Sequence, residues 1–135
     1  MSEIMQTVKI WTDGACMPNP GNGAWAALLE CEGKRKLISG PMEGQQTNNR
    51  AELMAMIAAL EALKRPCVVK LVSDSRYALN VASGEWNGSS NWDLIERLRK
   101  LGSIHQVSWI WKREFSTSEQ TTVHNEADAQ ALRIV

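Results

Sequence analysis

Two carboxylates stand where predicted strands end. Asp13 closes the strand-forming stretch MQTVKIWTD, residues 5–13, and Asp74 closes the apolar stretch CVVKLVSD, residues 67–74. Two adjacent parallel strands that each end on an aspartate place both side chains at one edge of the sheet, where ligands of α/β proteins gather. We therefore expect these two carboxylates to lie close together.

Two further carboxylates fall in predicted helix starts. Glu52 lies in the first turn of one predicted helix, and Asp128 lies in the first turn of the last one. Both positions suit a negative charge because a helix carries partial positive charge at its amino end. If all four side chains converge, their repulsion requires protons or cations. Hard divalent cations with oxygen ligands, Mg²⁺ or Mn²⁺, meet that need.

Each of the four carboxylates also has a purely structural explanation. Asp13 suits an Asx-type turn, and Asp74 suits the N-cap of the helix that follows it. Glu52 suits a capping box with Asn49, and Asp128 suits the dipole of its own helix. Spacing alone does not distinguish these explanations from a metal site.

The elements that must position these residues follow from periodicity and from turn-forming residues. The clearest predicted helix is 47–64, which has apolar residues at helical spacing and ends before Pro66. A polar loop is predicted at 114–123. The predicted strands are 5–13, 24–32, 37–42, 67–74 and 105–113, and the predicted helices are 47–64, 75–84, 92–102 and 124–134. This order, βββαβααβα, predicts one α/β domain over residues 1–135.

The composition limits the possible partners and the compartment. Fifteen basic and fifteen acidic side chains give a formal net charge of zero, so a nucleic acid would have to be held by local patches. Three cysteines, an odd number without metal-ligand spacing, indicate reduced thiols in a cytoplasmic protein. The sequence has no signal-peptide pattern and no apolar run of membrane-spanning length. We expect a monomer without a membrane partner.

Four segments together resemble the active-site blocks of bacterial-type ribonuclease H type 1, in the order in which that family has them. The resemblance runs from about Val8 to Leu132, nearly the whole chain. It implies a ribonuclease H-like α/β fold: a mixed five-stranded sheet, with the first three strands antiparallel and helices on both faces. The four segments are TDGACMPNPGNG (12–23), TNNRAELMAMIAALEAL (47–63), SDSRYAL (73–79) and HNEADAQAL (124–132).

The resemblance implies an endonuclease that hydrolyses the RNA strand of an RNA–DNA hybrid and leaves 5′-phosphate and 3′-hydroxyl ends. Two divalent cations, Mg²⁺ or Mn²⁺, are implied as cofactors, with Asp13 as the ligand that both share. The implied metal ligands are Asp13, Glu52, Asp74 and Asp128.

The resemblance also implies a substrate groove. Cys16, Asn19, Asn48 and Asn49 would line the groove that receives the minor face of the hybrid, and Thr47 would contact a DNA phosphate. Asparagine amides both donate and accept hydrogen bonds, which suits 2′-hydroxyl groups and base edges. One of the two neighbouring asparagines is also expected to cap the helix that starts there.

Three features depart from the family pattern. The basic, tryptophan-rich protrusion of many bacterial members shrinks to EWNGSSN (85–91), without Lys or Arg. The loop after the last strand lacks the usual histidine, and His124 is the hypothetical proton shuttle in its place, unless it is a solvated histidine at a helix start. Arg76 replaces a polar amide. It would bind a phosphate, stack on a base, or remain a surface cation.

Two other classes of function are considered. One is a catalytically weak or inactive module that only binds RNA–DNA hybrids, but binding alone has no use for a costly acidic cluster. The other is a related nuclease, such as a junction resolvase or an integrase core. Those share the metal chemistry but lack the PNPG and TNNRAE blocks found here.

Overall fold

The computed structural model describes residues 5–88 and 90–133. The predicted order of elements is confirmed. The elements are β1 (Thr7–Met17), β2 (Gly21–Cys31), β3 (Lys34–Gln46), α1 (Asn48–Glu61), β4 (Val68–Ser73), α2 (Arg76–Ser83), α3 (Trp92–Ile104), β5 (Gln106–Trp111) and α4 (Ser118–Arg133).

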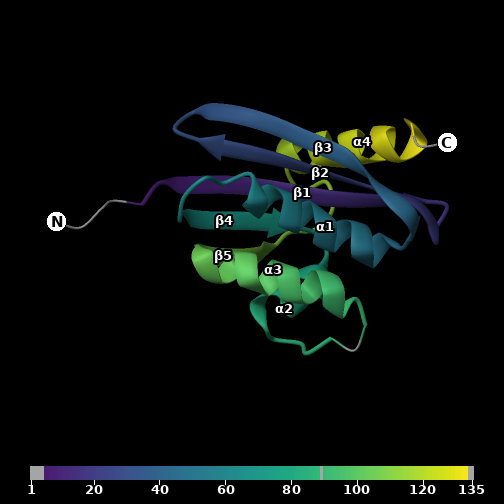
Figure 1. Ribbon diagram of the computed structural model, residues 1–135. Helices are drawn as coiled ribbons and strands as arrows, with labels where there is room; N and C mark the ends of the chain where they lie inside the picture. The colour runs from purple at the N-terminus through teal and green to yellow at the C-terminus, as the bar shows by residue number, and fades with distance from the viewer. Residues whose placement is uncertain (1–4, 89, 134–135) are drawn as a thin grey trace.

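The five strands form one mixed sheet in the order β3-β2-β1-β4-β5 (Figure 1). The first three strands pair antiparallel, and β4 runs parallel to both β1 and β5. The parallel pairing of β1 with β4 brings Asp13 and Asp74 to the same edge of the sheet.

Helices cover both faces of this sheet, as predicted. On one face the side chains of α1, α2 and α3 pack with Val8 and Ile10 of β1 in the larger core. On the other face α4 packs with Trp11 and Ala15 in a smaller core. Alternate residues of β1 therefore pack into the two cores, as expected for a strand that is buried on both faces.

The predicted end of the first strand is wrong. β1 continues to Met17 and pairs with β2 throughout, from Lys9 opposite Glu30 to Met17 opposite Asn22. Asp13 therefore lies within the strand, opposite Ala26, and not in an Asx-type turn at its end. Gly14, the turn-forming residue that follows Asp13, is instead required because α1 lies directly on the strand there.

The predicted start of the last helix is also wrong. α4 begins at Ser118, within the segment 114–123 that was predicted to be a loop. The Thr117 hydroxyl accepts a hydrogen bond from the Gln120 backbone at 3.1 Å, and the Gln120 side chain accepts one from the Thr117 backbone at 3.1 Å. This reciprocal pair is a capping box. Asp128 consequently lies in the third turn of α4 and not in its first.

Candidate active site

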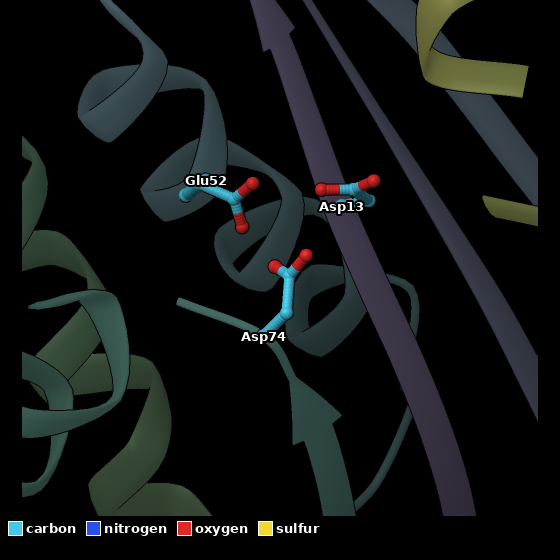
Figure 2. Close-up of side chains that lie close together, drawn as sticks. All are labelled: Asp13, Glu52 and Asp74. Atoms are coloured by element: carbon cyan, nitrogen blue, oxygen red, sulfur yellow. The ribbon is translucent and has the colours of Figure 1, made fainter. Parts of the chain in front are cut away.

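Three of the predicted carboxylates converge at one point. One side-chain oxygen from each of Asp13, Glu52 and Asp74 lies within 4.8 Å of the other two. Figure 2 shows the three side chains pointing toward one another from β1, from α1 and from the segment that follows β4. Three carboxylate oxygens this close could hold a cation between them.

The register of the sheet places the two aspartates. The parallel ladder between β1 and β4 aligns Trp11 with Val72. Asp13 and Asp74 each follow two residues later, so both project from the same edge and the same face. The helix α2 is capped by Ser75, whose side chain accepts a hydrogen bond from the Ala78 backbone, so the capping explanation for Asp74 is wrong.

A close approach of α1 to β1 places Glu52. A Cβ atom at Gly14 would lie 2.3 Å from the carbonyl carbon of Ala51 and 2.4 Å from the backbone nitrogen of Glu52. The Gly14 backbone donates a hydrogen bond to Glu52 Oε1 at 3.1 Å. Glu52 follows the first turn of α1, and Thr47 caps that helix, so the capping-box explanation with Asn49 is wrong.

The environment of Glu52 opposes its charge. Glu52 is buried, and its Oε2 has no hydrogen-bond partner. Burial, followed by the charge of Asp13, raises the pKa of Glu52 well above its usual range. Within the described chain, no lysine or arginine forms an ion pair with Asp13, Glu52 or Asp74. A buried carboxylate that points toward two others and has one oxygen without a partner fits a divalent cation.

The pKa of Asp74 is raised to about 6, first by burial and then by the charges of Asp13 and Glu114. Unfolded aspartate titrates near 3.9, so at intermediate pH the folded chain holds a proton that the unfolded chain has released. Ionised Asp74 therefore weakens the metal-free fold. The penalty is fully present above about pH 6 and is lost as the pH falls from about 6 to about 4.

Asp74→Asn is accordingly expected to be more stable than wild type at about pH 8 in a chelator, with an advantage that shrinks toward about pH 4. Urea unfolding midpoints of the two proteins at both pH values measure this difference. An advantage of equal size at both pH values would show that repulsion among the carboxylates is not its source.

The fourth predicted carboxylate, Asp128, is separated from this cluster by a histidine. His124 Nδ1 lies 3.0 Å from Asp13 Oδ2, and His124 Nε2 lies 3.1 Å from Asp128 Oδ2. Burial lowers the pKa of His124, but the hydrogen bond to Asp13 and the charge of Asp128 outweigh that effect and raise it. His124 is the seventh residue of α4, so the alternative of a solvated histidine at a helix start is wrong.

Two residues beside this histidine were missed by the sequence analysis. Glu114 Oε1 lies 3.8 Å from His124 Nδ1, and the ring of Phe115 meets the imidazole edge-on, with centroids 4.8 Å apart. Together with Asp13 and Asp74 they line one small depression. They belong to the segment after β5, where no periodic pattern marks individual residues. The only signal in the sequence for these two residues was that their segment occupies the place of the histidine loop in the family pattern.

The predicted groove residues lie around the start of α1. Asn19 Oδ1 accepts a hydrogen bond from the Asn48 backbone at 3.2 Å, and Thr47 caps the helix. The expectation that one of the neighbouring asparagines provides this cap is therefore wrong. Thr47, Asn19, Asn48 and Asn49 are all exposed to solvent.

Cys16 differs from the other groove residues because it is buried. Its thiol donates to the carbonyl oxygens of Pro18 and Gln46, at 3.2 and 3.3 Å. The side chain therefore ties the turn after β1 to the end of β3. Arg76 lies beyond Asp74, at the start of α2.

The comparisons with known proteins agree with this geometry. Residues 5–133 match the family model described as RNase H. A protein named ribonuclease H from Thermoanaerobacter sp. (strain X514) is 45% identical, with 98% of this chain and 94% of the relative covered. One from Gluconobacter oxydans (strain 621H) is 42% identical, with 83% of each covered.

A solved structure with a similar fold is that of LC11-RNase H1 in complex with an RNA/DNA hybrid. Its TM-score is 0.78 at 22% identity, with 93% of this chain and 99% of that chain covered. The chain belongs to the ribonuclease H family and is an endoribonuclease. No helix of the described residues is long and apolar enough to cross a membrane.

Proposed function

We propose that this chain hydrolyses the RNA strand of RNA–DNA hybrids at the cluster of Asp13, Glu52 and Asp74, leaving 5′-phosphate and 3′-hydroxyl ends. The observation that carries the proposal is the convergence of three carboxylate oxygens, one from each residue, within 4.8 Å of one another. Glu52 also has a buried oxygen, Oε2, without a hydrogen-bond partner. The hybrid bound to LC11-RNase H1, a protein of similar fold, supports the class of substrate.

Two divalent cations, Mg²⁺ or Mn²⁺, are the proposed cofactors, with Asp13, Glu52, Asp74 and Asp128 as their ligands. When bound, they would activate the attacking water and stabilise the leaving 3′-oxygen. The carboxylates position that chemistry, because Gly14 fixes one oxygen of Glu52 and leaves the other for a cation. Asp128 lies on the far side of the His124 ring from Asp13.

His124 is the proposed proton shuttle. Its two ring nitrogens lie 3.0 Å from a carboxylate of the cluster and 3.1 Å from Asp128, so a proton taken up at one nitrogen can leave from the other. General acid–base catalysis contributes about 10²-fold or more.

His124→Asn is therefore expected to lower kcat by about 10²-fold and to flatten its pH profile near neutrality. Steady-state kinetics between about pH 5.5 and 9 measure both, with the hybrid Kd and the unfolding midpoint as controls for binding and folding. A kcat within about threefold of wild type, with the same pH profile, would remove His124 from the mechanism.

The exposed residues at the start of α1 are the proposed contacts to the hybrid. Asn19, Asn48 and Asn49 present amides for 2′-hydroxyl groups and base edges, and Thr47 would meet a DNA phosphate. Cys16 supports this surface from inside. We place the protein in the cytoplasm as a single-domain monomer. Its three free thiols suit a reducing compartment.

The test is a panel of four labelled duplexes of one sequence: RNA–DNA with the label on either strand, RNA–RNA and DNA–DNA, each with Mg²⁺ and with Mn²⁺. Only the RNA strand of the hybrid is expected to be cut, and ligation or phosphatase sensitivity identifies the ends. Cleavage of DNA–DNA would indicate a different nuclease. Hybrid binding without cleavage in either metal would leave the binding module as the function.

A further inference from the structure

A second cavity lies beside the carboxylate cluster, between α2 and β5. Its volume is about 370 Å³, and it is open to solvent. Arg76, Asn80 and Ser83 line it from α2, and Trp109 and Trp111 line it from β5. None of these residues belongs to the cluster. Leu79 and Glu85 complete the lining, so the cavity combines one cation, two indoles and two small polar side chains with one carboxylate at its exposed side.

The cavity is tied to the cluster through Trp111. The Trp111 indole Nε1 donates a hydrogen bond to the backbone oxygen of Asp74 at 3.1 Å. The Arg76 guanidinium lies over this ring, 4.1 Å from its centroid. Arg76 follows Asp74 by two residues, which span at most about 7 Å of chain. The guanidinium is therefore held at a defined place directly beyond the cluster.

The charge of Arg76 is not paired with a carboxylate in the part of the chain that the structure describes. Arg35, Arg50 and Arg97 each form an ion pair with a carboxylate, whereas Arg76 forms none within residues 5–88 and 90–133. A guanidinium stacked on a ring has its N–H donors in its own plane, so they remain available to oxygen atoms at its edge. Bidentate binding of a phosphate by arginine requires this arrangement.

We infer that this cavity is a phosphate subsite for the substrate strand, in which Arg76 binds the backbone phosphate next to the one at the carboxylate cluster. The inference rests on the proposed function and assigns Arg76 the phosphate role among those considered for it. Asn80 and Ser83 line the same cavity and offer donors to the sugar–phosphate chain. Trp111 is the platform that orients the guanidinium.

Glu85 marks the outer limit of the subsite. It is an exposed carboxylate that also lines the cavity, and its charge opposes a phosphate placed near it. The nucleic-acid strand therefore passes along the side of the cavity that Arg76 lines, away from Glu85. Removing the charge in Glu85→Gln is expected to tighten hybrid binding by about twofold to threefold.

The test compares Arg76→Gln with Arg65→Gln. Both remove one arginine charge, and Arg65 is exposed at the opposite end of β4. Fluorescence anisotropy with a labelled RNA–DNA hybrid, in a chelator and over a series of salt concentrations, gives Kd and its salt dependence. Arg76→Gln is expected to raise Kd about tenfold and to reduce the slope of log K against log salt by about 0.9.

Cleavage kinetics separate this subsite from the chemistry. Arg76→Gln should raise KM and leave kcat within about threefold, and Trp111→Leu should act in the same direction through loss of the platform. If wild type cleaves the hybrid but Arg76→Gln matches Arg65→Gln in Kd and salt slope, the subsite is wrong and the proposed function stands. If wild type neither binds nor cleaves the hybrid, both fall together.

Discussion

Replacing Asp13 with asparagine is expected to lower the rate of RNA-strand cleavage by about 10³-fold or more. Asp13 is central to the cluster, because its oxygens lie close to Glu52 and Asp74 on one side and 3.0 Å from His124 on the other. Asparagine keeps the shape but removes the charge that holds a cation. The transition-state stabilisation at stake is several kcal/mol, and each 1.36 kcal/mol corresponds to about tenfold in rate.

The same substitution should stabilise the metal-free fold. The charge of Asp13 raises the pKa values of both Glu52 and Asp74, so it costs folding free energy when no cation is bound. A chelator-treated Asp13→Asn protein is therefore expected to unfold at a higher temperature than wild type.

The matched control for Asp13→Asn is Glu96→Gln on the exposed face of α3, where the carboxylate pairs only weakly, with Lys100 at 3.5 Å. It should leave both cleavage and thermal stability unchanged. An Asp13→Asn protein that is inactive but also destabilised would indicate a structural aspartate. One that retains full activity would contradict the proposed site.

Gly14→Ala is expected to destabilise the fold by about 3 kcal/mol, the upper end for an overpacked site. The added Cβ would meet the backbone of Ala51 and Glu52 at 2.3 and 2.4 Å, and backbone atoms cannot rotate away as a side chain can. The helix α1 must then move off β1, which also removes the hydrogen bond from Gly14 to Glu52. Urea unfolding measures the loss of stability, and activity should fall even where the variant remains folded.

Gly33→Ala is the control for Gly14→Ala. It replaces a glycine where an added Cβ contacts nothing, so it measures the backbone effect of losing a glycine without the clash against α1. Gly33 lies in the β2–β3 turn with φ of +77° and nothing within 4 Å of an added Cβ. Its substitution should cost only the strain of a left-handed residue, about 1 to 2 kcal/mol, with cleavage unaffected. Equal losses for the two variants would show that contact between α1 and β1 at Gly14 is not as tight as described.

The sequence predicted the convergence of Asp13 and Asp74 because parallel neighbouring strands bring matched positions to one edge. It mispredicted the end of β1, since Gly14 resembles a turn residue although it meets the requirement of close packing between β1 and α1. The start of α4 was readable in principle from Thr117 and Gln120, three residues apart, which is the spacing of a capping box.

The contacts around His124 could not be predicted from residue spacing. They depend on how α4 packs across β1, which brings residues 111 positions apart in the chain to 3.0 Å. Glu114 and Phe115 lie in an irregular segment, where neither helical nor strand periodicity assigns a direction to a side chain. His124 and Asp128 are four residues apart in α4 and therefore lie on one helix face, where His124 Nε2 is 3.1 Å from Asp128 Oδ2.

Anomalous diffraction from crystals grown with Mn²⁺ tests the central claim most directly, because it locates a bound cation without reference to activity. The account predicts an anomalous peak within coordination distance of Asp13, Glu52 Oε2 and Asp74, and its loss in Asp13→Asn crystals. Strong manganese peaks elsewhere, with none at these three carboxylates in wild-type crystals of an enzyme that cleaves hybrids, would contradict it.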